Sequence, residues 1–304
     1  MNGELANVIA LALQGTAWLQ NPSAAPPDLE GVNSTFQYVG SVRFEPPPSR
    51  WRRTEALSST GTWLRWLRAQ RVRRLWLVIP EATGGPLEPH VEVAFSNGGQ
   101  WATLATGRRA SIWLPRWEVG DRNAADNRAW SVTYVGAWAD GSTVPSRVPI
   151  DSALTSLADA LAEARELAQE QALDMWADWF ADGLERGRAA RAEVPFHPDL
   201  APRPPVTEEV ARLLAAAAKS FVFGGMGSWN DVWLSDADAR SRYDAVSRDL
   251  YRAVLGAFVA ATNCELDGET AGGRHQGLDE GSSQIYPRVR RASRYPGSPR
   301  VFLK

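Results

Sequence analysis

The 304-residue sequence contains few of the cysteine and histidine residues from which many catalytic and metal sites are built. Its single cysteine, Cys264, excludes an internal disulfide and a cluster of thiolate ligands. None of its three histidines (His90, His197 and His275) has a second histidine or a cysteine at metal-ligand spacing. No Gly-x-Ser-x-Gly nucleophile elbow is present. We therefore predict no metal and no cofactor. We favour a non-enzyme, although folding can still assemble an active site from distant residues.

Lysine and long hydrophobic runs are also scarce. Only Lys219 and Lys304 are lysines, and this use of arginine, together with abundant alanine, indicates a GC-rich bacterial genome. The apolar run 8–13 is far shorter than the roughly 18 residues that a membrane-spanning helix needs. It is preceded by Glu4 and by no basic segment, which does not fit a secretory signal peptide. We expect a cytoplasmic protein.

The composition is that of a globular protein that can bury a sizeable core. Hydrophobic residues make up 44% of the sequence, and 14 residues are tryptophan. The chain therefore lacks the low hydrophobicity and high net charge that keep a chain disordered. Its net charge of −2 creates no overall field that would attract nucleic acid or an anionic membrane, so both are disfavoured as partners.

Apolar residues that recur with the period of a strand predict a sheet in the N-terminal half. The predicted strands cover 36–44, 75–79, 91–95, 101–104, 111–114 and 130–135. Asn97-Gly98-Gly99 predicts a hairpin, and the wholly apolar run 75–79 predicts a central strand. Because the strands are joined by short turns, we expect an antiparallel sheet.

Helical spacing dominates the C-terminal half. The predicted helices cover 3–20, a segment from Trp51 or Thr60 to Gln70, a long helix from Asp151 or Ser152 to Gly183 or Arg188, 207–220, and 237–262. Five prolines between 194 and 206 predict an extended connector. We predict an α+β fold, with an antiparallel sheet and flanking helices in 1–150, a helical region in 151–264 packed on or beside the sheet, and a poorly packed tail in 265–304.

The most distinctive segment is a glycine loop with polar residues. The candidate binding loop consists of Gly224, Gly225, Gly227, Ser228, Trp229, Asn230 and Asp231. Glycines let a backbone approach a ligand, and exposed N–H groups can hold an anion. The loop has no lysine, so it is not a nucleotide-binding P-loop. The alternative is a tight turn whose Trp229 and Trp233 pack into the core.

An acidic ladder follows the predicted long helix. It contains Glu163, Glu166, Glu170, Asp174, Asp178 and Asp182. Residues three or four apart share a helix face, so several carboxylates could converge on a divalent cation. The helix carries no histidine, which catalytic carboxylate helices usually include. The same spacing fits a solvated face, or a docking face for a basic partner.

Arginine and tryptophan are interleaved between residues 43 and 74. Nine arginines against Glu45 and Glu55 give this segment a charge of +7. Such a segment suits contact with nucleic acid, or it could face the acidic helix. The resulting candidate interaction surface contains Arg52, Arg53, Arg65, Arg68, Asp174, Asp178 and Asp182.

These features favour a protein without catalysis whose partner is another protein, as in an immunity protein that neutralises a toxin. Tryptophan and arginine are enriched at interfaces, and segregated charge steers association. One alternative is an enzyme or small-ligand binder that uses the loop 224–231. A second alternative is a nucleic-acid-binding protein that uses the segment 43–74.

Overall fold

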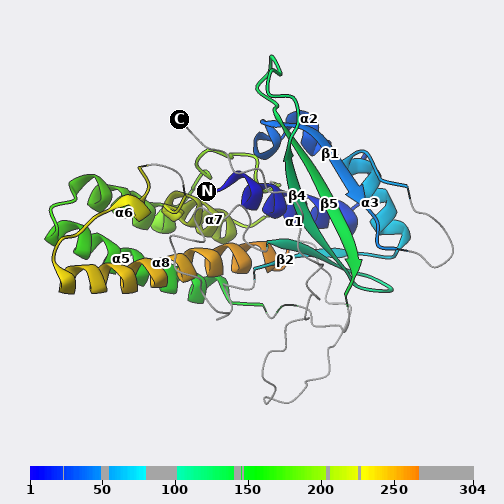
Figure 1. The fold of residues 1–304 in the computed structure, drawn as a ribbon. Helices are drawn as coiled ribbons and strands as arrows, with labels where there is room; N and C mark the ends of the chain where they lie inside the picture. The colour runs from blue at the N-terminus through cyan, green and yellow to red at the C-terminus, as the bar shows by residue number, and fades with distance from the viewer. Residues whose placement is uncertain are drawn as a thin grey trace.

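The protein consists of a sheet with covering helices at one end and a bundle of four helices at the other (Figure 1). The structure is a computed structural model that describes residues 1–22, 24–48, 55–79, 101–139, 145, 147–202, 206–224 and 227–266. Strands lie in the N-terminal half and the C-terminal half is helical, so the predicted α+β fold is confirmed.

The elements follow the predicted order. The helices are α1 (Gly3–Gln20), α2 (Leu29–Val32), α3 (Thr60–Ala69), α5 (Ile150–Glu170), α6 (Asp174–Arg188), α7 (Glu208–Ser220) and α8 (Ala237–Asn263), with 3-10 turns η1 (Ser34–Phe36) and η3 (Trp229–Asp231). The strands are β1 (Val39–Glu45), β2 (Arg74–Val78), β3 (Ala102–Thr106), β4 (Ser111–Val119) and β5 (Trp130–Trp138). The strand predicted at 91–95 and the hairpin at 97–99 lie outside the described residues, as does the tail from residue 267 onward.

The sheet has the order β1-β5-β4-β3-β2 and is mixed. The pairs β2–β3, β3–β4 and β4–β5 are antiparallel, as predicted, whereas β1 runs parallel to β5. The chain between β1 and β5 includes α3 and three strands, which is long enough to return to the starting edge before β5 begins. The expectation of a purely antiparallel sheet was wrong for this pair.

The apolar run 75–79 contributes most of β2, which lies at an edge of the sheet formed by the described strands and not at its centre. Its outward backbone groups are bonded by helix side chains. The Thr16 hydroxyl in α1 bonds the N–H and C=O of Leu75 at 3.0 and 3.2 Å, and the Asn263 amide in α8 bonds those of Leu77 at 2.8 and 2.9 Å. The strand is apolar because its side chains are buried, Leu75, Trp76 and Leu77 among them. The contacts with α1 and α8 close its outer edge to pairing with another chain.

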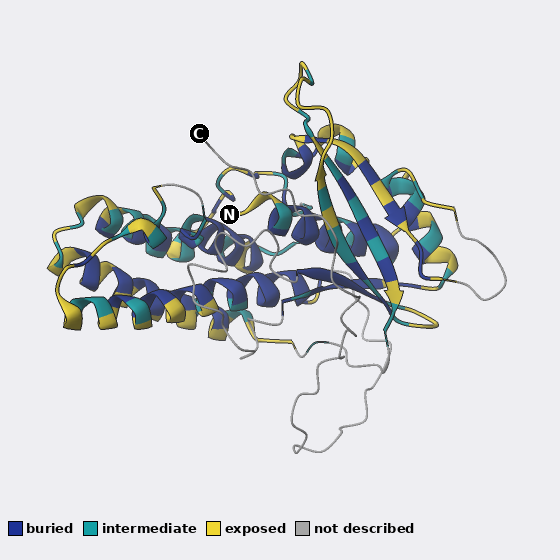
Figure 2. Ribbon diagram, viewed as in Figure 1, coloured by how far each residue is buried: buried dark blue, intermediate teal, exposed yellow. Residues whose placement is uncertain are grey.

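Aromatic rings fill the core between the sheet and α3. Phe44 stacks on Trp63 with ring centroids 4.5 Å apart and on Tyr134 at 4.9 Å, and Trp113 meets Trp63 edge-on at 5.4 Å. All four side chains are fully buried. Figure 2 shows the same division in the bundle, whose helices turn their buried faces inward. The apolar residues that recur with the period of a strand or of a helix are therefore the residues that the fold buries.

The predicted long helix is two helices. α5 ends at Glu170 and α6 begins at Asp174, and the chain reverses through Ala172, whose φ is +53°. The two helices then pack side by side in the bundle. α8 is the longest helix, with 27 residues and a length of ~40 Å, and it runs from the far end of the bundle to β2 (Figure 1).

Candidate functional site

The glycine loop directs its polar side chains onto its own backbone. Gly224 and Gly227 have φ values of +137° and +77°, which only glycine adopts easily. The Ser228 hydroxyl donates to the Gly224 carbonyl at 2.9 Å, and the Gly227 N–H donates to the Asp231 carboxylate at 2.5 Å. Gly225 lies outside the described residues. These bonds close a turn, and the glycines serve its geometry.

The same loop carries a core residue of the bundle. Trp229 is fully buried and packs edge-on against Phe180 at 5.1 Å, while its indole N–H donates to the Ser247 hydroxyl at 2.7 Å. Tyr243 donates to the Trp229 carbonyl, and burial raises the pKa of Tyr243 to about 12. The loop therefore anchors α8 against α6. Trp233, which the helical spacing placed in the core with Trp229, is 76% exposed.

Three members of the acidic ladder are paired within the bundle. Asp182 lies 2.8 Å from the Lys219 ammonium and 2.9 Å from the Arg186 guanidinium. Burial raises the pKa of Asp182, but Lys219 and Arg186 outweigh this effect and hold the pKa below its ordinary value. Glu166 and Glu170 both pair with Arg242 of α8. The paired acids tie helices to one another.

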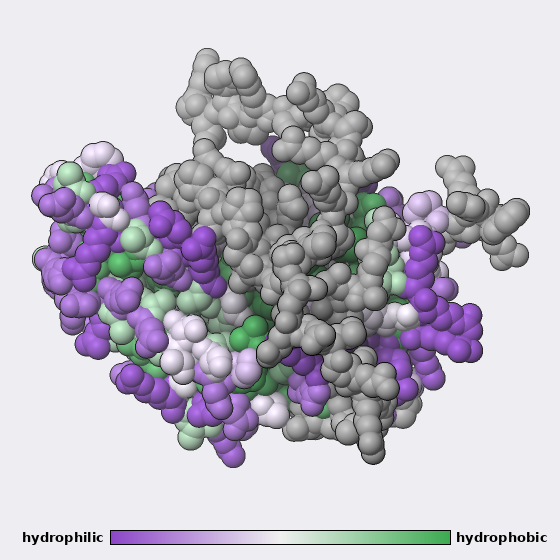
Figure 3. Space-filling model, turned by 90° about the horizontal axis from the view of Figure 1, so that it is seen from below, coloured by the Kyte–Doolittle hydropathy of each residue, from purple (hydrophilic) through white to green (hydrophobic). Residues whose placement is uncertain are grey.

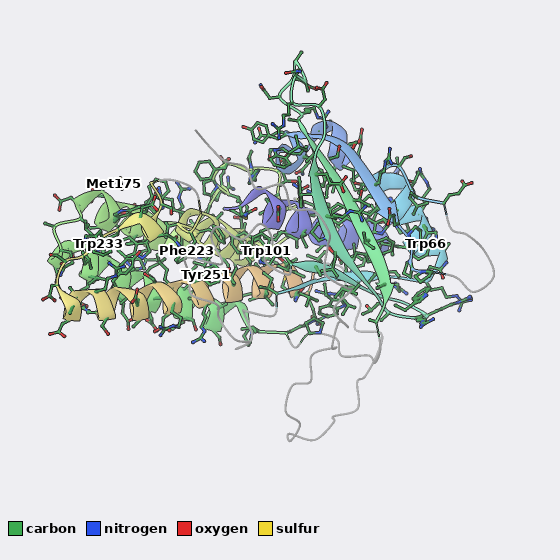
Figure 4. All side chains as sticks on the ribbon, viewed as in Figure 1. Trp66, Trp101, Met175, Phe223, Trp233 and Tyr251 are labelled. Atoms are coloured by element: carbon green, nitrogen blue, oxygen red, sulfur yellow. The ribbon has the colours of Figure 1, made fainter. Side chains whose placement is uncertain are left out.

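Two further acids of the ladder, Asp174 and Asp178, lie on α6 near the end of the bundle farthest from the sheet, where two large apolar side chains are exposed. Met175 is 61% exposed, and Figure 4 places it and Trp233 together at that end. The Arg240 guanidinium stacks over the Trp233 ring at 4.2 Å. Exposed carboxylates flank the pair, namely Asp174, Asp178, Asp236 and Asp238. We call Met175, Trp233 and these four acids the bundle tip.

The predicted arginines lie at the opposite end of the molecule. Arg65 and Arg68 are exposed on α3, far from α6 (Figure 1), so the candidate surface that joined them to Asp174, Asp178 and Asp182 is divided between two ends. Arg52 and Arg53 lie outside the described residues. The turn between β3 and β4 adds two exposed arginines that the 43–74 segment did not contain. We call Arg65, Arg68, Arg71, Arg73, Arg108 and Arg109 the arginine patch.

One cluster of potentially reactive side chains was not predicted. The Ser34 hydroxyl lies 3.3 Å from Nδ1 of His197 and donates to the Asp199 carboxylate. Asp199 also accepts from the Ser34 N–H at 2.9 Å, and its carbonyl accepts from the Asn33 amide at 2.8 Å. In a nucleophilic triad the histidine would take the serine proton, whereas here the proton goes to the carboxylate. These hydrogen bonds hold the connector between α6 and α7 against η1. The cluster was not predicted because Ser34 lies more than 160 positions from His197 and Asp199 in the sequence.

The described residues contain no group of three or more histidine, cysteine, aspartate or glutamate side chains placed to hold a metal ion. Cys264 is buried at the end of α8, where its thiol donates to the Ala261 carbonyl at 3.1 Å. Within the described ranges, no helix combines the length and the apolar character needed to cross a membrane. Comparisons with protein-family models, with curated proteins and with solved structures find no match to the chain.

Proposed function

We propose that the chain is a binding protein that recognises another protein through its bundle tip. The observation that carries this proposal is the exposure of Met175 and Trp233, at 61% and 76%, at the end of the bundle where aspartates are exposed as well. Tryptophan is among the side chains that contribute most to protein interfaces, because one buried ring contributes a large apolar area. Methionine adapts its shape to a partner.

The charge around the tip indicates what kind of protein would fit. Residues 151–266 hold 19 acidic and 11 basic residues, a net charge of −8. The exposed aspartates of the tip have no ion-pair partner among the described residues. Complementary charge speeds association and excludes like-charged proteins. The partner is therefore a basic protein with an apolar pocket for the tryptophan ring.

The two polar clusters of the fold support a binding role over a chemical one. The loop 224–231 and the group Ser34, His197 and Asp199 direct their hydrogen bonds into the fold. An immunity protein that covers a basic toxin is one member of the class we propose. The partner would then be the toxin itself.

The test compares capture of proteins by the wild-type chain and by two double variants. We expect the variant Trp233→Ser with Met175→Ser to lose a partner that wild type retains, because both apolar side chains leave the interface. The matched control is Val32→Ser with Tyr38→Ser, which removes two exposed apolar side chains near the sheet. With the captured protein purified, titration calorimetry should give an affinity about 30-fold or more weaker for the tip variant.

Two results would count against the proposal. One is a purified chain that captures no stoichiometric protein. The other is a partner that the tip variant binds as tightly as the control variant does. Raising the salt concentration supplies a further check, because a basic partner should associate more slowly as its attraction to the acidic tip is screened.

A further inference from the structure

The fold builds the arginine patch from two segments that are distant in sequence. α3 presents Arg65 and Arg68, and the chain after it presents Arg71 and Arg73 on the way into β2. The turn that carries Arg108 and Arg109 is held beside them, since the Arg108 N–H donates to the Gln70 carbonyl at 3.2 Å. A side chain at Gly107 would collide with the Gln70 carbonyl, at 2.8 Å from its Cβ, so glycine permits this contact.

The charges of the patch have no acidic partner within the described part of the chain. Three arginines of the bundle are paired, Arg186 with Asp182, Arg212 with Glu209, and Arg242 with two glutamates. Among the described residues, two guanidinium groups of the patch lie over tryptophan rings. Arg68 lies over Trp18 at 5.7 Å, and Arg109 lies over Trp138 at 4.5 Å. Figure 3 shows hydrophilic residues at the right-hand edge of the molecule, on the side where α3 lies in Figure 1, and also over the bundle.

We propose that the arginine patch binds the phosphate backbone of a nucleic acid. A guanidinium presents a planar fork of donors that matches two phosphate oxygens, and it remains charged at any physiological pH. Six exposed guanidinium groups on two adjoining segments, without a carboxylate partner among the described residues, provide the electrostatic footprint of a phosphate-binding site. The stacked tryptophans hold two of the guanidinium groups in place, which reduces the entropy lost on binding.

The neighbourhood of the patch favours a nucleic acid over a lipid surface. Peripheral membrane sites combine basic residues with large apolar side chains that enter the bilayer. The exposed large apolar residues of the described chain are Val32, Tyr38, Val119, Trp130, Val148, Met175, Phe196 and Trp233, and none belongs to the patch. The patch therefore offers charge and hydrogen-bond donors without an anchor for lipid.

The experiment measures the anisotropy of a labelled oligonucleotide, in single-stranded and duplex forms, as the full-length protein is added at several salt concentrations. The test variant is Arg65→Ala with Arg73→Ala and Arg108→Ala. The control is Arg122→Ala with Arg165→Ala and Arg248→Ala, which removes the same charge from exposed positions outside the patch. We expect wild type and control to bind at low salt, and the test variant to bind about tenfold or more weakly. Its slope of log affinity against log salt should fall by about two to three, since each phosphate contact contributes roughly 0.7–0.9.

No binding at low salt, or an equal loss in both triple variants, would overturn the inference. Anionic vesicles and polyglutamate serve as competitors. Competition by either one as strong as that of unlabelled oligonucleotide also overturns it, in favour of a membrane or an acidic protein. Because the measurement uses no protein partner and leaves Trp233 intact, its outcome is independent of the bundle tip.

Discussion

His197 is only 7% exposed, and it lies where the connector between α6 and α7 crosses η1. Its neighbours Ser34 and Asp199 make bonds that hold the connector in place. The Asp199 carbonyl also accepts from the Gln14 amide of α1 at 3.0 Å. Burial disfavours the charged form of an imidazole, so His197 stabilises the fold in its neutral form.

Burial therefore makes the stability of the protein depend on pH through His197. Burial lowers the pKa of His197, the positive amino terminus acts in the same direction, and Asp199 and Ser34 oppose both. The unfolded chain, with a histidine pKa near 6.5, then binds a proton more readily than the folded protein. The stabilising contribution is complete above pH 6.5 and is lost as the pH falls from there through the folded-state pKa.

Urea unfolding at about pH 8 and about pH 5 measures this dependence. We expect the free energy of unfolding of wild type to fall by more between the two values than that of His197→Gln, which cannot take up the proton. Equal losses in the two proteins would show that another group is responsible.

At the scale of elements, the sequence predicts those helices and strands whose apolar residues repeat at a regular spacing. α8 was predicted at 237–262 and occupies 237–263, because an apolar face repeats along its whole length. α3 begins at Thr60, the second of its two predicted starts, where Ser59 and Thr62 form a capping box. The break between α5 and α6 was missed, since Gln171, Ala172 and Leu173 include no glycine or proline. The chain reverses here because α6 packs against α5 and α7. The residues of the turn have no intrinsic preference that would predict it.

The left-handed conformation at Ala172 should have a measurable cost. The left-handed backbone conformation destabilises a non-glycine residue by roughly 1–2 kcal/mol. Glycine adopts it at almost no cost, although glycine loses more conformational entropy on folding. We expect Ala172→Gly to stabilise the protein by about 0.5–1 kcal/mol in urea unfolding.

The control is the exposed helical residue Ala162, where the same replacement should lower the free energy of unfolding. The same replacement, Ala162→Gly, lies in the interior of α5 and should destabilise the protein by about 1 kcal/mol. A destabilising effect at both positions would mean that the Ala172 conformation carries no strain.

At the scale of the whole molecule, the net charge of −2 conceals a separation of charge. The acidic bundle and the arginine patch lie at opposite ends, so the averaged charge gave no reason to expect either (Figure 1). The residues Asp174, Asp178, Arg65 and Arg68, on which the two proposals rest, were singled out from their spacing and composition. Met175, Arg108 and Arg109 were not, because exposure and the proximity of distant segments are set by tertiary packing and leave no trace in local sequence.

Buried polar contacts add to the continuous hydrophobic core that joins these two ends. Asn263, at the end of α8, bonds both backbone groups of Leu77, and its own carbonyl accepts from the Arg74 guanidinium at 2.8 Å. The side chain is 1% exposed, so water cannot replace the bonds. Leucine at this position would leave the N–H and C=O of Leu77 buried without partners, each at a cost of about 1–3 kcal/mol.

Asn263→Leu should therefore lower the free energy of unfolding by about 2–4 kcal/mol, while Asn123→Leu, in the exposed turn between β4 and β5, should change it little. If these contacts couple the sheet to the bundle, helix loss by circular dichroism and tryptophan emission should follow one urea transition in wild type. In Asn263→Leu the two signals should separate, because most of the helical residues lie in the bundle, whereas most of the described tryptophans lie at the sheet end. Coincident transitions in both proteins, with an unchanged midpoint, would place the coupling elsewhere, in the contacts of α1 or the connector.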